Sequence, residues 1–276
     1  MFQSDLLQDK CILITGGGTG LGKSMGRRVL ELGARLVICR RQGVLEETRE
    51  EFDEDFPNRT RAIPCDLRDP AQVQAMVNEI WDEGSLDALV NNAAGNFLAR
   101  SESLSPRALD AVLAIVMHGT AYVTLACGKR WLAEGHPGNV LSIVATYAET
   151  GSPYVVPSAM AKAGVLAMTR SLAVEWGGRG IRLNAIAPGP FPTEGAWSRL
   201  VPNEEMNKAW MNKIPLGRVG EHRELADLAV FLLAESSAYI NGEVVTIDGG
   251  EWLKGAGQFS LMEDLSAEDW AAMKGR

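Results

Sequence analysis

A glycine-rich run near the start of the chain has the composition of a phosphate-binding turn. The run Thr15-Gly16-Gly17-Gly18-Thr19-Gly20-Leu21-Gly22 follows the apolar stretch CILIT and precedes a helical pattern. Glycine lets a backbone approach a pyrophosphate closely, and the start of the next helix offers free N–H groups. A glycine cluster alone could be a flexible turn, but the strand before it and the helix after it favour a nucleotide site. The expected nucleotide-binding residues are Gly16, Gly18, Thr19, Gly20, Leu21 and Gly22.

Two arginines at the end of the second apolar run bear on the choice of cofactor. Enzymes that prefer NAD usually have Asp or Glu here to hold the ribose 2′-hydroxyl, whereas this chain has Arg40 and Arg41. Guanidinium groups can pair with a 2′-phosphate, so the sequence predicts NADPH/NADP. The alternative is a pair of solvated surface side chains. Asp66, at the end of the third run, is expected to accept a hydrogen bond from the adenine amino group.

Apolar runs and helical patterns alternate along the chain and would position these residues. Nearly continuous apolar runs, typical of strands buried on both faces, occupy 11–15, 35–39, 60–65, 86–91, 138–144, 181–187 and 243–248. Helical patterns lie near 21–33, 43–54, 70–83, 105–133, 159–177 and 222–234. The alternation predicts an α/β fold with a single doubly wound parallel sheet and helices on both faces. Residues 1–250 are expected to form one NADP-binding and catalytic domain. Residues 251–276 would be a C-terminal extension packed on that domain or on a neighbouring subunit.

Composition and charge exclude several classes of protein. The chain has 276 residues, 46% of them hydrophobic and 22% charged, which is typical of a globular protein. Its net charge of −8 argues against a general nucleic-acid or anionic-membrane binder, although a local basic pocket remains compatible with it. No window reaches the ~18 apolar residues of a membrane span, so no membrane insertion is expected.

The cysteines and the two ends of the chain bear on its location. Four widely spaced cysteines, Cys11, Cys39, Cys65 and Cys127, show neither disulfide nor metal-ligand spacing. The first ten residues lack a leader-like apolar segment, and the final MKGR is not a peroxisomal signal. We therefore expect a cytoplasmic protein with reduced cysteines and no metal site.

Three motifs together resemble the short-chain dehydrogenase/reductase family over roughly residues 8–250. They are the glycine run, Asn91-Asn92-Ala93-Ala94-Gly95 and Pro188-Gly189-Pro190, and the resemblance implies a Rossmann fold. The family's Tyr-x-x-x-Lys signature appears here with Ser158 in the tyrosine position and Lys162 as the lysine. The usual catalytic serine falls near Ala145, and His118 replaces the usual helix asparagine. The chain could therefore be catalytically silent, or it could belong to a subfamily whose acid has moved.

Tyr147 favours the second explanation. It lies 15 residues before Lys162, the spacing of the 2,4-dienoyl-CoA reductases. Asn96-Phe97, VVPSAMAKAGV, GPFPTEGAWSRL and the tail GQFSLMEDLSAEDW are also similar to that subfamily. The resemblance implies a homotetramer that uses NADPH to reduce 2,4-dienoyl-CoA to 3-enoyl-CoA in the β-oxidation of unsaturated fatty acids.

The resemblance also implies residue roles. Tyr147 and Asn96 would donate hydrogen bonds to the thioester oxygen as a dienolate forms. Lys162 would hold the nicotinamide ribose and favour ionisation or hydrogen donation by Tyr147. Further implied cofactor contacts are Leu67, Asn92, Pro188, Gly189 and Phe191. Implied acyl-CoA contacts are Arg68, Phe97, Ser105, Ser158 and Arg199.

Other interpretations of these residues stay open. Tyr147 could be an ordinary turn residue, Asn96 a turn cap, and Lys162 a solvated helix lysine. Each arginine could be a solvated surface charge, and His118 is expected to pack or to hold water rather than to catalyse. The second functional reading is a 3-oxoacyl-thioester or carbonyl reductase, disfavoured because a serine at position 158 is a poor proton donor to an alkoxide. The third is a catalytically silent NADP-binding regulatory protein. Acyl length and double-bond geometry are not readable from the sequence.

Overall fold

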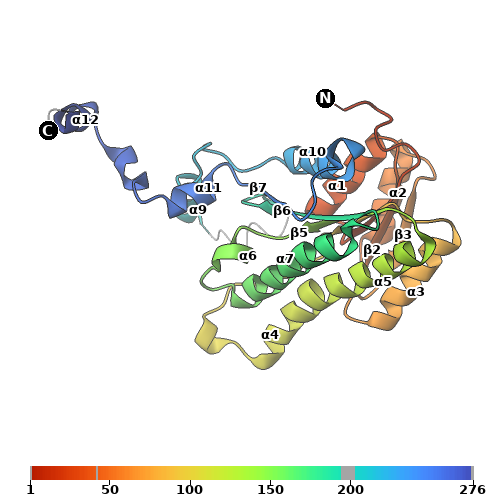
Figure 1. Ribbon diagram of the computed structural model, residues 1–276. Helices are drawn as coiled ribbons and strands as arrows, with labels where there is room; N and C mark the ends of the chain where they lie inside the picture. The colour runs from red at the N-terminus through yellow and green to blue at the C-terminus, as the bar shows by residue number, and fades with distance from the viewer. Residues whose placement is uncertain (1, 42, 194–202, 275–276) are drawn as a thin grey trace.

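A seven-stranded parallel sheet forms the centre of the protein, in a computed structural model that describes residues 2–41, 43–193 and 203–274 (Figure 1). The strands are β1 (Cys11–Thr15), β2 (Arg35–Arg40), β3 (Thr60–Pro64), β4 (Ala88–Asn91), β5 (Gly138–Ile143), β6 (Ile181–Pro188) and β7 (Val244–Ile247). Their order is β3-β2-β1-β4-β5-β6-β7. The predicted doubly wound α/β fold is confirmed, because the chain builds the sheet outward from β1 in one direction and from β4 in the other.

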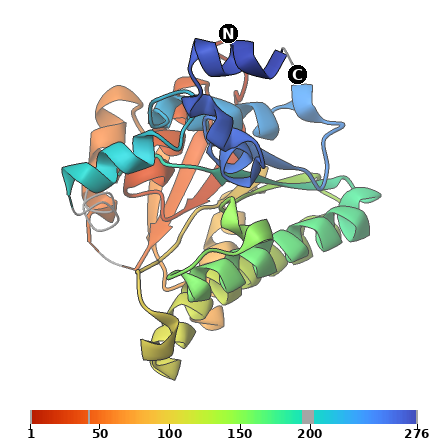
Figure 2. The same cartoon turned by 90° about the vertical axis from the view of Figure 1, so that its left-hand side faces the viewer.

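Helices cover both faces of the sheet (Figures 1 and 2). The helices α1 (Gly20–Glu31), α2 (Leu45–Asp55) and α10 (His222–Leu233) share one buried core. The helices α3 (Pro70–Asp82), α5 (Gly119–Glu134) and α7 (Val156–Gly177) form the other. Along β1, Ile12 and Ile14 enter the first core while Leu13 enters the second. Both faces of each strand are thus buried, which explains why the apolar runs show no alternation.

The helix expected at 105–133 has a break in its hydrogen bonding. It consists of α4 (Pro106–Leu113), a π-helical turn (Ala114–His118) and α5. Among the described residues, only Pro106–Glu134 is long and apolar enough to span a membrane, and half of its most apolar window is buried in the fold. The packing of α5 in the second core accounts for this composition. His118, expected to be packed or water-bound, is exposed, with its ring centroid 6.2 Å from that of Tyr122.

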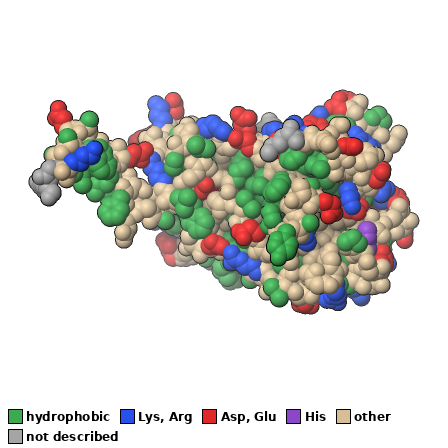
Figure 3. Space-filling view, turned by 45° about the horizontal axis from the view of Figure 1, so that its top comes forward, with side chains coloured by type: hydrophobic (Ala, Val, Ile, Leu, Met, Phe, Trp, Pro, Cys, Tyr) green, Lys and Arg blue, Asp and Glu red, His purple; other side chains and the backbone are tan. Residues whose placement is uncertain are grey.

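The apolar pattern of the sequence does not predict the short elements, because they span too few turns to show a period. They are α6 (Tyr147–Thr150), α9 (Glu204–Met211), α11 (Glu251–Ala256), α12 (Ala267–Lys274) and 3₁₀ turns at Ser101–Ser103, Glu235–Ser237 and Ser260–Asp264. The last part of the chain projects from the body and carries exposed apolar side chains (Figures 1 and 3). These include Leu253, Phe259, Leu261, Trp270 and Met273. The packing of this extension in an assembly stays a prediction.

Candidate active site

A cavity of about 2210 Å³ opens at the carboxyl ends of the strands. It lies where β1 and β4 are neighbours and the chain leaves them toward opposite edges, which is where ligands bind in open parallel sheets. Of the residues predicted from the sequence, the cavity is lined by Gly16, Thr19, Gly20, Leu21, Arg40, Arg41, Leu67, Asn92, Asn96, Phe97, Tyr147, Lys162, Pro188, Gly189 and Phe191. The fold therefore brings the predicted catalytic set and most of the predicted cofactor set to one place.

The glycine turn is bonded to the segment after β4. Gly16 and Gly20 have φ values of +67° and +53°, which glycine adopts readily. Asn92 donates from Nδ2 to the carbonyl oxygens of Thr15, at 3.0 Å, and Gly16, at 3.3 Å. A Cβ at Gly22 would lie 2.5 Å from Asn92 Nδ2, so Gly22 is needed for this close approach. Gly22 thus has a packing role and does not line the cavity.

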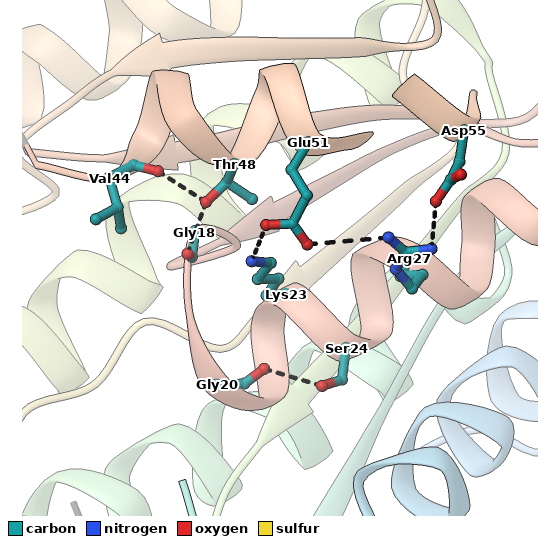
Figure 4. Close-up of polar contacts among 9 residues, drawn as sticks. All are labelled: Gly18, Gly20, Lys23, Ser24, Arg27, Val44, Thr48, Glu51 and Asp55. Atoms are coloured by element: carbon teal, nitrogen blue, oxygen red, sulfur yellow. Dashed lines mark hydrogen bonds and ion pairs between the residues drawn. The ribbon is translucent and has the colours of Figure 1, made fainter. Parts of the chain in front are cut away.

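The first turn of α1 is held in place by α2 (Figure 4). Thr48 Oγ1 lies 2.9 Å from the Gly18 carbonyl oxygen, so Gly18 contacts α2 rather than the cavity. Lys23 and Glu51 form an ion pair between the two helices at 2.5 Å. The side chain of Thr19 makes no capping hydrogen bond to α1. The first N–H groups of this helix are therefore available to an anion in the cavity.

Arg40 and Arg41 lie on the cavity wall beside this turn. A Cβ at Gly18 would be 3.9 Å from Arg40 Cδ. Both arginine side chains are exposed, and within the described parts of the chain neither takes part in an ion pair. The pair is consequently free to meet an added phosphate next to the helix terminus.

Asp66 and Arg68 form an ion pair with each other beside the cavity. The Arg68 guanidinium lies 2.6 Å from Asp66 Oδ2 and lowers the pKa of that carboxyl. Neither side chain lines the cavity, because each satisfies the other beside the wall formed by Leu67. Their predicted contacts with adenine and CoA stay predictions.

Two predicted substrate residues also lie off the cavity wall, and a third cannot be placed. Ser105 is the N-cap of α4, where its Oγ accepts a hydrogen bond from Ala108 N at 3.2 Å. Ser158 is 2% exposed and contacts Tyr147 instead of the open cavity. Arg199 lies outside the described residues. Of the predicted acyl-CoA contacts that the structure describes, Phe97 alone lines the cavity.

Tyr147 and Ser158 form a hydrogen-bonded pair between two helices. Tyr147 begins α6, Ser158 lies in the first turn of α7, and their hydroxyl oxygens are 3.0 Å apart. Burial raises the pKa of the Tyr147 phenol and outweighs the opposing effect of the Ser158 hydrogen bond. Tyr147 is therefore a neutral phenol near pH 7, able to donate a hydrogen bond into the cavity.

Lys162 lies one turn further along α7 and is buried. Its Nζ donates to the carbonyl oxygen of Ile143 at 2.5 Å, and burial lowers its pKa to about 8. The solvated-lysine interpretation is therefore wrong. The shift of the Tyr147 pKa comes from burial and the Ser158 hydrogen bond, and the expected effect of Lys162 on Tyr147 stays a prediction.

Asn96 follows β4 and lines the cavity. Its Oδ1 accepts a hydrogen bond from the backbone N–H of Phe97 at 2.9 Å, as the turn-cap interpretation requires. Within the described parts of the chain, its Nδ2 makes no hydrogen bond. The cap orients the amide and leaves a donor for a ligand, so the structural and catalytic interpretations are compatible.

One side of the cavity was not anticipated. It is formed by the end of α9, the segment after α9 and α11, with Trp210, Lys213, Glu251, Trp252 and Lys254 among its residues. Burial raises the pKa of Glu251, against the effect of a hydrogen bond from the Trp210 indole. No motif in the sequence marks Lys213. Within the described ranges, no cluster of three or more His, Cys, Asp or Glu side chains could hold a metal ion.

Comparison with known proteins identifies many relatives of this chain. A family model described as Enoyl-(Acyl carrier protein) reductase matches residues 16–251. A Bacillus subtilis protein described as a probable 2,4-dienoyl-CoA reductase, (2E)-enoyl-CoA-producing, is 43% identical over 250 residues, covering 90% of this chain and 98% of the relative. The peroxisomal 2,4-dienoyl-CoA reductase of Danio rerio, (3E)-enoyl-CoA-producing, is 35% identical over 258 residues, covering 93% and 86%.

Solved structures show the same fold. A short chain dehydrogenase from Bacillus anthracis superposes with a TM-score of 0.79 and 42% identity, covering 88% of this chain and 96% of that one. A gluconate 5-dehydrogenase from Burkholderia cenocepacia, in complex with NADP and tartrate, gives a TM-score of 0.84 and 29% identity, covering 91% and 98%. The sequence-derived fold and family are both supported by these matches.

Proposed function

This chain belongs to the short-chain dehydrogenase/reductase family, and from that premise we propose that it is an NADPH-dependent 2,4-dienoyl-CoA reductase. The observation that carries the proposal is the pair formed by Tyr147 and Ser158. The phenol of Tyr147, in α6, contacts Ser158, and Ser158 occupies the position that holds tyrosine in the family signature. The site thus keeps a tyrosine hydroxyl in contact with Ser158, one helical turn before Lys162, although the signature tyrosine is missing.

The residues of the cavity fit a dinucleotide phosphate. The uncapped start of α1 offers N–H groups to the pyrophosphate, and Gly16 and Gly20 keep the turn free of side chains. Arg40 and Arg41 carry the positive charge that favours a 2′-phosphate over a 2′-hydroxyl. Lys162 is the donor suited to the nicotinamide ribose. The chemistry that NADPH supplies when bound is a hydride for C5 of the dienoyl chain.

Tyr147 and Asn96 would stabilise the charge that develops on the substrate. Electrons move from the diene toward the thioester oxygen, giving a dienolate that needs hydrogen-bond donors already in place. The neutral phenol of Tyr147 and the free Nδ2 of Asn96 are such donors. No alkoxide forms at that oxygen, so the reaction does not demand an acid strong enough to make an alcohol there.

The position of the second proton decides which isomer is formed. Protonation of the dienolate at C2 leaves a C3–C4 double bond, whereas protonation at C4 leaves a C2–C3 double bond. We propose C2 protonation by water, giving 3-enoyl-CoA, because Tyr147 and Asn96 would hold the enolate end next to C2. The relatives' names include both products, so deuterium incorporation at C2 or C4 in D₂O is the measurement that decides.

The unanticipated side of the cavity is suited to the CoA phosphates. Lys254 lies in α11, just after the edge strand β7, and its Nζ donates to the carbonyl oxygen of Asn212, next to Lys213, at 2.8 Å. Arg40 and Arg41 lie at the end of β2, near the other edge of the sheet. Two separate groups of cations could therefore serve two polyphosphates. We assign the arginines to NADPH and Lys213 to CoA, because Lys254 is already paired with Glu263.

A spectrophotometric assay tests the proposal against its two competitors. NADPH oxidation is followed with 2,4-hexadienoyl-CoA and, separately, with acetoacetyl-CoA. Turnover of the dienoyl substrate alone supports the proposal, and turnover of the ketone alone supports a 3-oxoacyl-thioester or carbonyl reductase. Absence of turnover with both would support a silent NADP-binding protein.

We also propose a cytoplasmic homotetramer. All four cysteines are buried and free, as expected in a reducing compartment. Leu125 on α5 and Met160 and Val174 on α7 are exposed apolar side chains, suited to contacts between subunits. Mass photometry of the purified protein tests the assembly, and fluorescence localisation tests the compartment.

A further inference from the structure

His222, the first residue of α10, lies outside the cavity and forms hydrogen bonds to two segments that contribute to its walls. Its Nδ1 lies 2.9 Å from Ser24 Oγ on α1, and its Nε2 lies 2.7 Å from the carbonyl oxygen of Pro192. Ser24 in turn lies 3.1 Å from the carbonyl oxygen of Gly20, a contact drawn in Figure 4. One imidazole thus joins the glycine turn to the segment that follows β6.

The hydrogen-bonding capacity of these groups decides how the ring is used. A carbonyl oxygen can only accept, so Nε2 of His222 must carry a proton and donate to Pro192. The Ser24 hydroxyl has one proton, so it either donates to Nδ1 of His222, or donates to the Gly20 carbonyl oxygen and accepts from a protonated Nδ1. In both arrangements the ring links α1 to Pro192 by two hydrogen bonds.

The segment Pro190–Thr193 packs against the residues at the starts of α1 and α10. The backbone N–H of Gly220 donates to the Pro190 carbonyl oxygen at 3.0 Å. A Cβ at Gly220 would lie 2.3 Å from the ring of Phe191, so this ring rests directly on the glycine backbone. On the other side, a Cβ at Gly20 would be 3.1 Å from Thr193 Cγ2. The segment is therefore packed between the starts of α1 and α10.

We propose that His222 is a positioning residue for the coenzyme. Gly20 and Leu21 line the cavity on one side of the bridge, and Pro190 and Phe191 line it on the other. Because His222 holds these two walls in place before the coenzyme binds, it reduces the conformational entropy that the protein loses on binding. The inference deepens the proposed function and depends on its NADPH site, although not on the identity of the acyl substrate.

Fluorescence titration of NADPH into the protein without acyl-CoA tests the bridge. His222→Ala should raise the dissociation constant for NADPH by about tenfold, because two hydrogen bonds to the walls are lost. Ser24→Ala, which removes only the α1 side, should raise it less. His222→Gln can still donate to Pro192 and should recover part of the affinity. At saturating NADPH, kcat with the dienoyl substrate should change less than threefold in all three variants.

Arg223→Ala is the matched control. Arg223 follows His222 on α10 and pairs with Glu31 of α1 at 3.0 Å, so it also links these helices but does not contact Pro190–Thr193. Its loss should leave the NADPH dissociation constant within twofold of wild type. If His222→Ala behaves like this control while wild type binds NADPH, the inference is overturned and the proposed function stands. If wild type itself binds no NADPH, the coenzyme assignment fails, and the inference fails with it. Thermal unfolding of each variant shows whether a loss of affinity reflects a loss of folding.

Discussion

The phenol oxygen of Tyr147 lies 3.0 Å from the Oγ of Ser158, although the two residues belong to different helices. Ser158 takes the place of a tyrosine in a Tyr-x-x-x-Lys signature, and Tyr147 approaches that place from α6. A phenol hydroxyl is thereby retained in contact with the signature position. Because burial keeps the phenol neutral, the site is suited to hydrogen-bond donation more than to proton transfer.

Tyr147→Phe should lower kcat with 2,4-hexadienoyl-CoA by ~10² or more, because it removes one of two donors to the enolate oxygen. NADPH absorbance in steady-state assays measures the effect. Tyr154→Phe is the control, since Tyr154 is 58% exposed and is not part of the cavity wall. Retention of full activity by Tyr147→Phe would exclude the phenol as an oxyanion donor.

Ser158→Ala should reduce kcat by about tenfold, less than the loss of Tyr147, because alanine removes only a hydrogen bond that positions the phenol. The Ser158 hydrogen bond lowers the pKa of Tyr147, so the phenol in the variant should titrate at a higher pH. Ultraviolet difference titration against Tyr147→Phe measures this change. If Ser158→Ala abolishes turnover while Tyr147→Phe does not, the assignment of the donor is wrong.

Replacing Arg40 and Arg41 together by alanine should raise the dissociation constant for NADPH by about 10², with little effect on NADH. The physical reason is loss of the charge-assisted hydrogen bonds to the 2′-phosphate. Titration with both coenzymes gives the ratio directly. Arg35→Ala removes a cation from the opposite end of the same strand and should leave the ratio unchanged. An equal loss for NADH would contradict a role specific to the phosphate.

Lys162 should make the stability of the protein depend on pH in alkaline solution. Burial lowers its pKa to about 8 in the folded state, whereas the ordinary value of 10.5 is expected after unfolding. Between these values the unfolded chain binds more protons, so the free energy of unfolding attributable to Lys162 rises with pH. Wild type should therefore gain stability relative to Lys162→Met from about pH 8 to pH 10. Denaturant unfolding at several pH values measures it, and a constant difference would contradict the buried charge.

Lys213→Ala should raise the KM for 2,4-hexadienoyl-CoA by about fivefold, through loss of one cation near the CoA phosphates, while leaving the NADPH dissociation constant unchanged. Lys208→Ala is the control, because Lys208 belongs to the neighbouring helix α9 but does not line the cavity. Free CoA should also inhibit the Lys213→Ala variant more weakly than it inhibits wild type, by a factor similar to the change in KM. Equal KM values for the two variants would remove Lys213 from the substrate site.

Much of the fold could be predicted from the sequence because its signals are local. Each strand of the sheet coincided with an apolar run, with ends that differ by at most two residues. The glycine turn, the asparagine segment after β4 and the Pro188 segment after β6 are also contiguous motifs. Short helices such as α6 and α9 were missed because one or two turns carry too little periodicity.

The sequence by itself determined the α/β fold, the glycine turn and the candidate pair Tyr147 and Lys162. Strand burial, backbone freedom and motif spacing depend on residues that are close together in the chain, so each can be inferred from a short segment. Only the tertiary structure decided which side chains face the cavity. It paired Arg68 with Asp66 beside the wall, used Ser105 as a helix cap, and brought Lys213 and the His222 bridge to the site. Such contacts join residues as far apart in the chain as Ser24 and His222. They depend on how the helices pack around the sheet, which no single segment encodes.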